Sequence, residues 1–222
     1  TIRVNGAGTP WHEDDLRAVA AAGPAGVVVP KVGSAAQVRS LVAALEEAGA
    51  PEHTALWAMV ETPEAILGVA ELAAASPRLA VLVMGTNDLV KELRAAHVPG
   101  RAPLLTALSM SVLAARAAGV AILDGVFNDV RDEEGFLAEC GQGRDLGFDG
   151  KTLIHPGQVE GANATFAPGP EAVAEAHGIL EAWTAGGGAG VVTYNGRLIE
   201  NLHVDTARRV VAVDQLIRGR AG

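Results

Sequence analysis

Cysteine and aromatic residues are both scarce in this chain of 222 residues. Cys140 is the only cysteine, so an intramolecular disulfide is impossible, and a reducing, cytoplasmic location is expected. Aromatic residues make up 4% of the chain and hydrophobic residues as a whole 49%, so the core must be built from Ala, Val, Leu and Ile. Such a core is typical of helices that alternate with buried parallel strands.

The chain also lacks a net positive charge and long apolar runs. The formal net charge of -9 at pH 7 argues against nucleic acid or an anionic membrane as the main partner. No apolar run reaches the length of a transmembrane helix. We therefore expect neither a nucleic-acid nor a membrane partner, and an anionic ligand would need local positive charge.

Six short β-branched runs alternate with stretches rich in Ala, Leu and Glu that have helical character. One of these stretches, Ser34 to Gly49, starts with a serine and ends with a glycine, the residues that helix caps favour. We expect the six runs to be strands buried on both faces. They span residues 1–5, 26–31, 55–61, 79–85, 120–126 and 150–156.

The spacing of the predicted strands favours an α/β fold of the (β/α)8 TIM barrel type. Their starts lie 24 to 41 residues apart, which suits the βα units of such a barrel, whose usual total is about 250 residues. Since six strands are visible, we expect the two N-terminal βα units of the barrel, roughly 50 to 65 residues, to be absent from this sequence. A doubly wound open sheet is the alternative, but no Gly-rich phosphate-binding fingerprint follows any predicted strand.

The sequence pattern changes after the sixth predicted strand. A helix, a flexible glycine-rich joint, a hairpin with Asn-Gly at its turn and a last helix are expected in turn, over 170–183, 186–190, 191–200 and 204–218. The tail is too small to form a domain of its own. We therefore predict a barrel domain over 1–183 and a C-terminal hairpin-helix arm or lid over 184–222.

Polar side chains follow the predicted strands at their carboxyl ends, where the loops of a barrel converge on its mouth and its reacting groups lie. These residues are Arg3, Asn5, Lys31, Glu61, Asp88, Asp124 and His155. Two of these acids, with the arginine and the lysine, would suit a hard cation and an anionic substrate if they surround one mouth.

Glu61 ends the hydrophobic run from Ala55 to Val60 and is followed directly by Thr62 and Pro63. It is either a metal ligand or a helix cap, because threonine and proline make a good helix start. As a ligand it would converge with Asp88 on one Mg²⁺, which takes few protein ligands at about 2.0 to 2.1 Å and keeps other positions for water and substrate. Spacing alone leaves both interpretations open.

Four other residues have two interpretations each. Lys31 either orients an anionic substrate or forms a salt bridge with an acid at the mouth. Asp124 either supports the metal through water or holds a backbone turn, and the structural role is favoured. A hydrogen-bonded structural role is also favoured over catalysis for His155, and a core role over reactivity for Cys140.

Several stretches of the chain resemble the citrate lyase β-subunit-like proteins of the HpcH/HpaI aldolase and malyl-CoA lyase superfamily. The stretches are "RVNG", "VVVPKV", "VETPEAI", "VMGTNDL" and, most specific of all, "ILDGVFNDVRDEEGFLAECGQGRDLGFDGKTLIHPGQV". The likeness runs from Arg3 into the tail. It implies a barrel of the phosphoenolpyruvate/pyruvate type.

The resemblance also implies an activity. Such a protein would be a Mg²⁺-dependent carbon-carbon lyase that cleaves a 3-hydroxyacyl-CoA of citryl-, malyl- or citramalyl-CoA type to acetyl-CoA and a 2-oxo acid. Glu61 and Asp88 would bind the metal, Arg3 would stabilise the thioester enolate, and Arg3, Lys31 and Glu61 would contact the acyl-CoA or 2-oxo acid. Fixed cationic groups in a water-poor mouth stabilise an enolate better than bulk water does.

The tail has an implied role of its own. Relatives pack as homotrimers in which the tail of one subunit lies over the active site of its neighbour, and its acid takes part in proton transfer at the acetyl carbon. Glu200 stands at that position, where relatives often have aspartate, and Asn87 stands where many relatives have a second acid.

Two other functions remain as alternatives to the lyase. One is a metal-dependent aldolase acting on 2-oxo acids without CoA, and the other is a non-catalytic fragment or subunit with a role in assembly. Glu61 and Asp88 would serve the lyase and the aldolase equally, so they do little to distinguish these two enzymes. The tail favours the lyase, because a lid is more useful over a long thioester than over a small free acid.

Overall fold

The structure is a computed structural model that describes residues 1–187 and 190–220. It divides the chain into two compact units, Thr1–Ala162 and Asn163–Gly222. This boundary falls earlier than the one predicted between 183 and 184, and the functional division into barrel and arm stays a prediction. Within the described ranges, no helix has both the length and the apolar character needed to cross a membrane.

The first unit is built on a six-stranded parallel sheet whose strands follow one another in chain order from β1 to β6. The strands are β1 (Ile2–Arg3), β2 (Gly26–Val29), β3 (Ala55–Val60), β4 (Leu79–Met84), β5 (Ala121–Asp124) and β6 (Gly150–Lys151). All six predicted strands are therefore confirmed, although each is shorter than predicted. This sequential order has no point at which the strand order reverses, so the doubly wound alternative is wrong.

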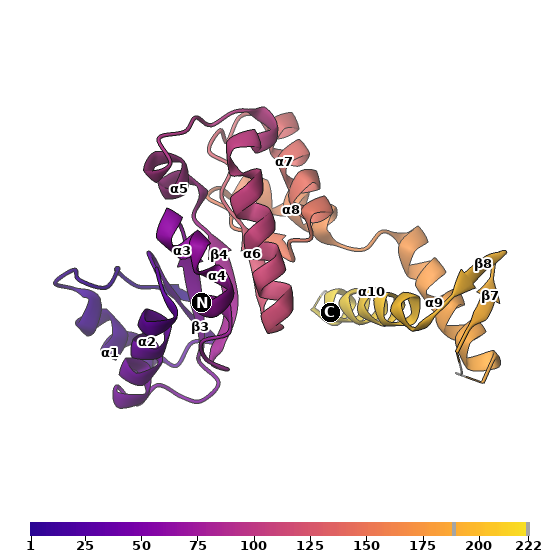
Figure 1. The fold of residues 1–222 in the computed structure, drawn as a ribbon, viewed down its shortest axis with the longest axis horizontal. Coiled ribbons are helices and arrows are strands. Elements are labelled where there is room, and N and C mark those ends of the chain that lie inside the picture. The colour runs from indigo at the N-terminus through magenta and orange to yellow at the C-terminus, as the bar shows by residue number, and fades with distance from the viewer. Residues whose placement is uncertain (188–189, 221–222) are drawn as a thin grey trace. The chain divides into compact units, whose positions relative to one another are not determined.

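Helices connect the strands, as parallel pairing requires (Figure 1). They are α1 (His12–Ala22), α2 (Ala35–Glu47), α3 (Pro63–Leu67), α4 (Val69–Ala73), α5 (Thr86–Glu92), α6 (Leu105–Ala118) and α7 (Glu133–Leu146); α8 (Val159–Phe166) crosses the boundary between the units. The predicted serine cap is confirmed, because the Ser34 side chain accepts a hydrogen bond from the N–H of Gln37 at 3.2 Å.

The core of the first unit is aliphatic, as the composition predicts, and β2 and β4 consist largely of buried residues. Burial is less uniform elsewhere in the sheet. In β3, buried and half-buried residues alternate, and both residues of β1 are exposed. The prediction that every strand is buried on both faces is therefore wrong for β1, because β1 pairs only with β2 and lies at an edge of the described sheet.

The second unit contains α9 (Pro170–Ala185), the antiparallel hairpin of β7 (Val192–Tyr194) and β8 (Arg197–Ile199), and α10 (Asn201–Arg220). The hairpin turn falls on Asn195 and Gly196, whose φ angles of 49° and 75° are those that a two-residue turn of this hand needs. Trp183, Ile199 and Val204 form the core of this unit. The predicted hairpin and final helix are confirmed, while the predicted joint lies partly outside the described residues.

Candidate active site at the strand ends

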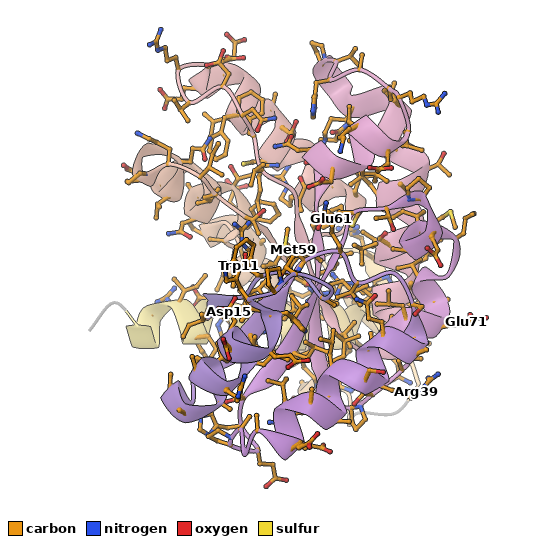
Figure 2. All side chains as sticks on the ribbon, turned by 90° about the vertical axis from the view of Figure 1, so that its left-hand side faces the viewer. Trp11, Asp15, Arg39, Met59, Glu61 and Glu71 are labelled. Atoms are coloured by element: carbon orange, nitrogen blue, oxygen red, sulfur yellow. The ribbon has the colours of Figure 1, made fainter. Side chains whose placement is uncertain are left out.

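A cavity of about 420 Å³ opens at the carboxyl ends of the strands, and we call it the mouth. Arg3, Lys31, Glu61 and Asp88 all line it. The parallel sheet thus brings together four predicted site residues that are up to 85 positions apart in the chain, from Arg3 to Asp88. In Figure 2 Glu61 lies in the interior near Met59, which also lines the mouth.

Glu61 faces the mouth and does not cap the helix behind it. Its side chain is buried, with the residue 3% exposed, and Oε1 accepts the backbone N–H of Lys31 at 2.8 Å. The cap of α3 is instead Thr62, whose hydroxyl accepts the N–H of Ala65 at 3.2 Å, with Pro63 as the first helical residue. The helix-cap interpretation of Glu61 is therefore wrong.

Burial raises the pKa of Glu61 above its usual value. The hydrogen bond from the Lys31 N–H opposes this rise, the negative charge of Asp88 adds to it, and the positive charges of Lys31 and Arg3 oppose it. A buried carboxylate whose ionised form is costly gains most when a cation is placed beside it.

Lys31 contacts both acids of the mouth. Its backbone N–H binds Glu61, and its Nζ lies 3.5 Å from Asp88 Oδ1. Its backbone is left-handed, with a φ of 56°, a conformation that costs a residue with a side chain on the order of 1 kcal/mol or more. The salt bridge foreseen for Lys31 is present, and its side chain, 58% exposed, also lines the mouth.

Asp88 lies in the first turn of α5 and is half-buried. Among the described residues, no three His, Cys, Asp or Glu side chains are grouped closely enough to hold a metal ion. Two carboxylates with open positions beside them suit Mg²⁺, which keeps several waters or substrate oxygens, whereas zinc sites need three or four protein ligands. The donor set of Glu61 and Asp88 therefore fits a hard divalent cation.

Arg3 and Asn5 approach the mouth from the end of β1, and both are exposed. The backbone N–H and the side-chain amide of Asn5 both donate to Asp15 Oδ2, at 2.9 and 2.8 Å, and these bonds lower the pKa of Asp15. Asn5 therefore shapes the loop between β1 and α1, which leaves Arg3 as the charged group at this side of the mouth.

The surroundings of Asp124, His155 and Cys140 agree with the structural roles that the sequence favours for them. Asp124 is fully buried and paired with Arg101 and Lys151, and it does not line the mouth. His155 is exposed, and its Nδ1 accepts the N–H of Gly157 at 3.1 Å, which caps the turn Pro156–Gln158. Cys140 is buried, and burial raises the pKa of its thiol, as expected for an unreactive core cysteine.

Sequence reasoning missed several residues of the mouth. Thr86 and Val126 line it, and two side-chain amides, of Asn87 on α5 and Asn128 in the loop after β5, exchange two hydrogen bonds, at 2.9 and 2.7 Å. Thr86 could have been predicted from the sequence, because it directly follows a glycine at a strand end. Nothing in the spacing of the chain pairs Asn87 with Asn128.

Glu200 belongs to the second unit, directly before α10. Its backbone N–H donates to Nδ1 of His203 at 3.0 Å, and its side chain is exposed. Its catalytic role stays a prediction.

The fold and the mouth together define the class of protein: an α/β protein with a parallel half-barrel sheet and a site with two carboxylates at its strand ends. The family described as HpcH/HpaI aldolase/citrate lyase matches residues 1–156. "(3S)-malyl-CoA thioesterase" of Cereibacter sphaeroides strain KD131 is 46% identical over 218 residues, 97% of this chain and 74% of that protein. "Citrate lyase subunit beta" of Escherichia coli strain K12 is 36% identical over 222 residues, with the same two shares. The chain belongs to the HpcH/HpaI aldolase/citrate lyase family.

Solved structures have the same fold. Protein CitE from Mycobacterium tuberculosis, in complex with magnesium, acetoacetate and coenzyme A, matches with a TM-score of 0.74 and 30% identity, over 96% of this chain and 78% of that one. A citrate lyase from Burkholderia xenovorans LB400 matches with a TM-score of 0.83 and 25% identity, over 97% of this chain and 72% of that one. The family resemblance foreseen from the sequence is confirmed.

Proposed function

We propose that this chain is a Mg²⁺-dependent carbon-carbon lyase that cleaves a 3-hydroxyacyl-CoA, of citryl-, malyl- or citramalyl-CoA type, to acetyl-CoA and a 2-oxo acid. The observation that carries the proposal is the convergence of Glu61, Asp88, Arg3 and Lys31 on one mouth. The magnesium, acetoacetate and coenzyme A in the CitE structure support the classes of cation and substrate. The CoA-independent aldolase and the non-catalytic subunit have no comparable support.

Each group of the mouth has a role in this reaction. Glu61 and Asp88 would hold Mg²⁺, which polarises oxygens of the 2-oxo acid when it is bound. Cleavage moves the electron pair of the broken carbon-carbon bond onto the acetyl carbon, as a thioester enolate, while the substrate hydroxyl loses its proton and becomes the carbonyl. The guanidinium of Arg3 would stabilise the enolate, and Lys31 and Glu61 would orient the substrate.

We further infer that the six strands belong to a (β/α)8 barrel of the phosphoenolpyruvate/pyruvate type, and that residues 184–222 act as an arm in a homotrimer. Glu200 of one subunit would then protonate the acetyl carbon in the active site of another. Mixing Arg3→Ala chains with Glu200→Ala chains tests the shared site. Each variant alone should be inactive, and mixed oligomers should regain partial activity; no recovery despite proven subunit exchange would reject it.

A second candidate reaction is hydrolysis of the thioester, which the name of the 46% identical relative favours. Both reactions can start from (3S)-malyl-CoA but give different products. The lyase yields acetyl-CoA and glyoxylate in equal amounts with no free thiol, whereas hydrolysis yields malate and free CoA. A product assay with Mg²⁺, and a matched assay with excess chelator, tests the proposal: chelator-sensitive glyoxylate supports the lyase, and free thiol without glyoxylate would overturn it in favour of hydrolysis.

A further inference from the structure

Four charged residues lie beside the mouth, three of them buried and Glu139 partly buried, and we call them the charge cluster: Arg101, Asp124, Glu139 and Lys151. Nη1 of Arg101 donates to both carboxylate oxygens of Asp124, at 2.7 and 2.8 Å. Nζ of Lys151 donates to Asp124 Oδ2 at 3.0 Å and to Glu139 Oε1 at 2.7 Å. The side chains are at most 16% exposed, and their two positive and two negative charges cancel.

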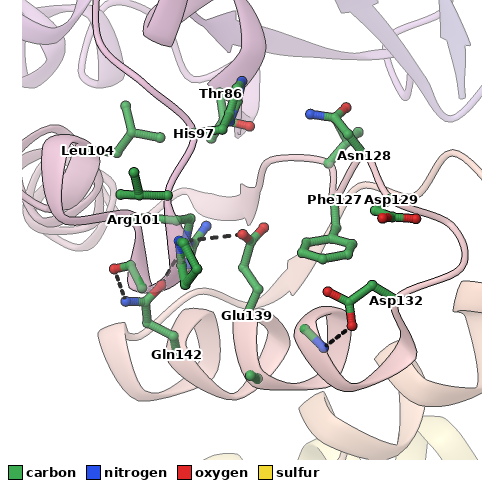
Figure 3. A pocket seen from close by; sticks show the side chains of 16 residues that line it. Thr86, His97, Arg101, Leu104, Phe127, Asn128, Asp129, Asp132, Glu139 and Gln142 are labelled. Atoms are coloured by element: carbon green, nitrogen blue, oxygen red, sulfur yellow. Dashed lines mark hydrogen bonds and ion pairs between the residues drawn. The ribbon is translucent and has the colours of Figure 1, made fainter.

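The charge cluster joins four separate parts of the first unit. Asp124 ends β5, Lys151 ends β6, Glu139 lies on α7, and Arg101 lies in the turn segment Pro99–Leu104 before α6. Figure 3 shows Arg101 and Glu139 on the wall of a second cavity, of about 400 Å³, which Thr86 also lines.

Stability alone is a poor explanation for such a cluster. The cost of removing charges from water offsets much of their attraction, and apolar replacements of buried ion pairs are often neutral or stabilising. Charge-assisted hydrogen bonds are directional, however, and they fix the relative positions of the elements that carry them. The hydrogen bonds of the charge cluster therefore connect the ends of β5 and β6 to each other and to α7.

Those strand ends are directly connected to the mouth. The carboxylate of Asp124 accepts the N–H of Gly125 at 2.8 Å, and its backbone oxygen accepts the N–H and hydroxyl of Thr152 at 3.0 and 3.1 Å. Thr152 and Val126 line the mouth.

Two close packing contacts continue from Gly125 to the metal-binding carboxylates. Gly125 lies against the buried side chain of Thr86, so tightly that a Cβ atom at position 125 would overlap Oγ1 and Cγ2 of that threonine. Thr86 begins α5, two residues before Asp88. Gly85, the residue before Thr86, lies against Glu61 in the same way, because a Cβ atom there would overlap Oε2.

We propose that the charge cluster positions Glu61 and Asp88 for the metal, through the contact of Gly125 with Thr86 and the contact of Gly85 with Glu61. Its members are positioning residues, since none of them lines the mouth. The inference rests on the proposed function, because it concerns the same metal site.

The contact of Gly125 with Thr86 is tested by Gly125→Ala, which pushes Thr86 without removing a charge. The matched control is Gly141→Ala on α7, where an added Cβ atom meets nothing within 4 Å. Calorimetric titration with Mg²⁺ alone should show an affinity about 10- to 100-fold weaker for Gly125→Ala, the range seen when residues behind metal ligands are changed, and wild-type affinity for Gly141→Ala.

The cluster itself is tested by the double variant Arg101→Met/Asp124→Leu, which removes one positive and one negative charge, together with every ion pair of Arg101 and Asp124, and leaves the Lys151–Glu139 pair intact. We expect a Tm close to that of the wild type and a Mg²⁺ affinity again about 10- to 100-fold weaker. Saturating Mg²⁺ should restore turnover of (3S)-malyl-CoA in this variant, but not in Glu61→Gln, which lacks a ligand.

The outcomes separate this inference from the proposed function. If the wild type binds Mg²⁺ and Glu61→Gln does not, while Gly125→Ala and the double variant keep wild-type affinity, then the positioning role is wrong and the metal site stands. If the double variant does not fold, the Mg²⁺ affinity of Gly125→Ala alone decides whether the positioning role is right. If the wild type binds no Mg²⁺, the proposed function is wrong, and the positioning role that rests on it is wrong as well.

Discussion

The mouth and the charge cluster contain the same kinds of side chain in opposite settings. At the mouth, Lys31 and Asp88 are 58% and 39% exposed and lie 3.5 Å apart, whereas Arg101 and Asp124 are 6% and 0% exposed and lie 2.7 Å apart. In the charge cluster every charge has a close partner of opposite sign. The mouth keeps a buried carboxylate, Glu61, beside a second acid, with its pKa raised by burial.

From this difference we infer which acids would bind a ligand and which hold the fold. Paired and buried carboxylates are already neutralised, so they have little to gain from a cation. Incompletely paired carboxylates beside an open cavity keep their attraction for one. Burial alone does not separate the two groups, since Glu61 and Asp124 are both buried.

The strongest effect on activity is expected for Glu61→Gln, which removes a ligand charge but little volume. We expect loss of Mg²⁺ binding and a fall in lyase turnover on the order of 10²-fold or more, with the fold intact. Calorimetry with Mg²⁺ and a product assay check this, with circular dichroism to confirm folding. Glu71→Gln, on the outer surface of α4 (Figure 2), is the control and should behave as wild type. Wild-type turnover by Glu61→Gln in excess chelator would contradict the metal site.

The second prediction compares the loss of stability when an acid is removed from the charge cluster and when one is removed from the mouth. Asp124→Ala leaves Arg101 and Lys151 buried with one carboxylate between them, so unfolding in urea should show a loss of about 3 to 5 kcal/mol. Asp88→Ala removes an acid whose salt bridge is exposed and should cost about 0 to 1 kcal/mol. Equal losses in the two variants would show that burial and pairing do not separate the groups.

A third prediction concerns the cap of α3. Thr62→Ala should destabilise the protein by about 1 kcal/mol, because the N–H of Ala65 loses its acceptor. Thr62→Ser keeps the acceptor and serves as the control, and thermal or urea unfolding measures both. If Thr62→Ala is neutral and Glu61→Gln costs about 1 kcal/mol instead, Glu61 is the cap after all.

The last prediction concerns Lys31, whose left-handed backbone suits glycine. Lys31→Gly should be more stable than Lys31→Ala by about 1 kcal/mol, because alanine keeps the strain of a Cβ atom at positive φ while both variants lose the same ammonium group. Equal stability in the two variants would show that Lys31 is unstrained.

The sequence predicted the sheet well and the site in part. β-branched runs are a local signal, so all six strands were found, and parallel topology then brought Arg3, Lys31, Glu61 and Asp88 to one edge. The exposure of β1 was not predictable, because it depends on which strands lie beside it.

The charge cluster could not be predicted from the sequence either. Arg101 and Lys151 meet Asp124 across 23 and 27 residues, and no periodicity marks such long-range ion pairs. The same holds for the close contact of Gly125 with Thr86, which depends on how two neighbouring strand ends pack. Local patterns identify the groups that can bind a ligand more readily than the groups that position them.

A crystal of the protein soaked in Mn²⁺, a stand-in for Mg²⁺ with anomalous scattering, would show where the cation binds. We expect one strong anomalous peak at bonding distance from the carboxylates of both Glu61 and Asp88, and none at Asp124 or Glu139. A peak at the charge cluster, or no peak between Glu61 and Asp88 at saturating Mn²⁺, would contradict this expectation.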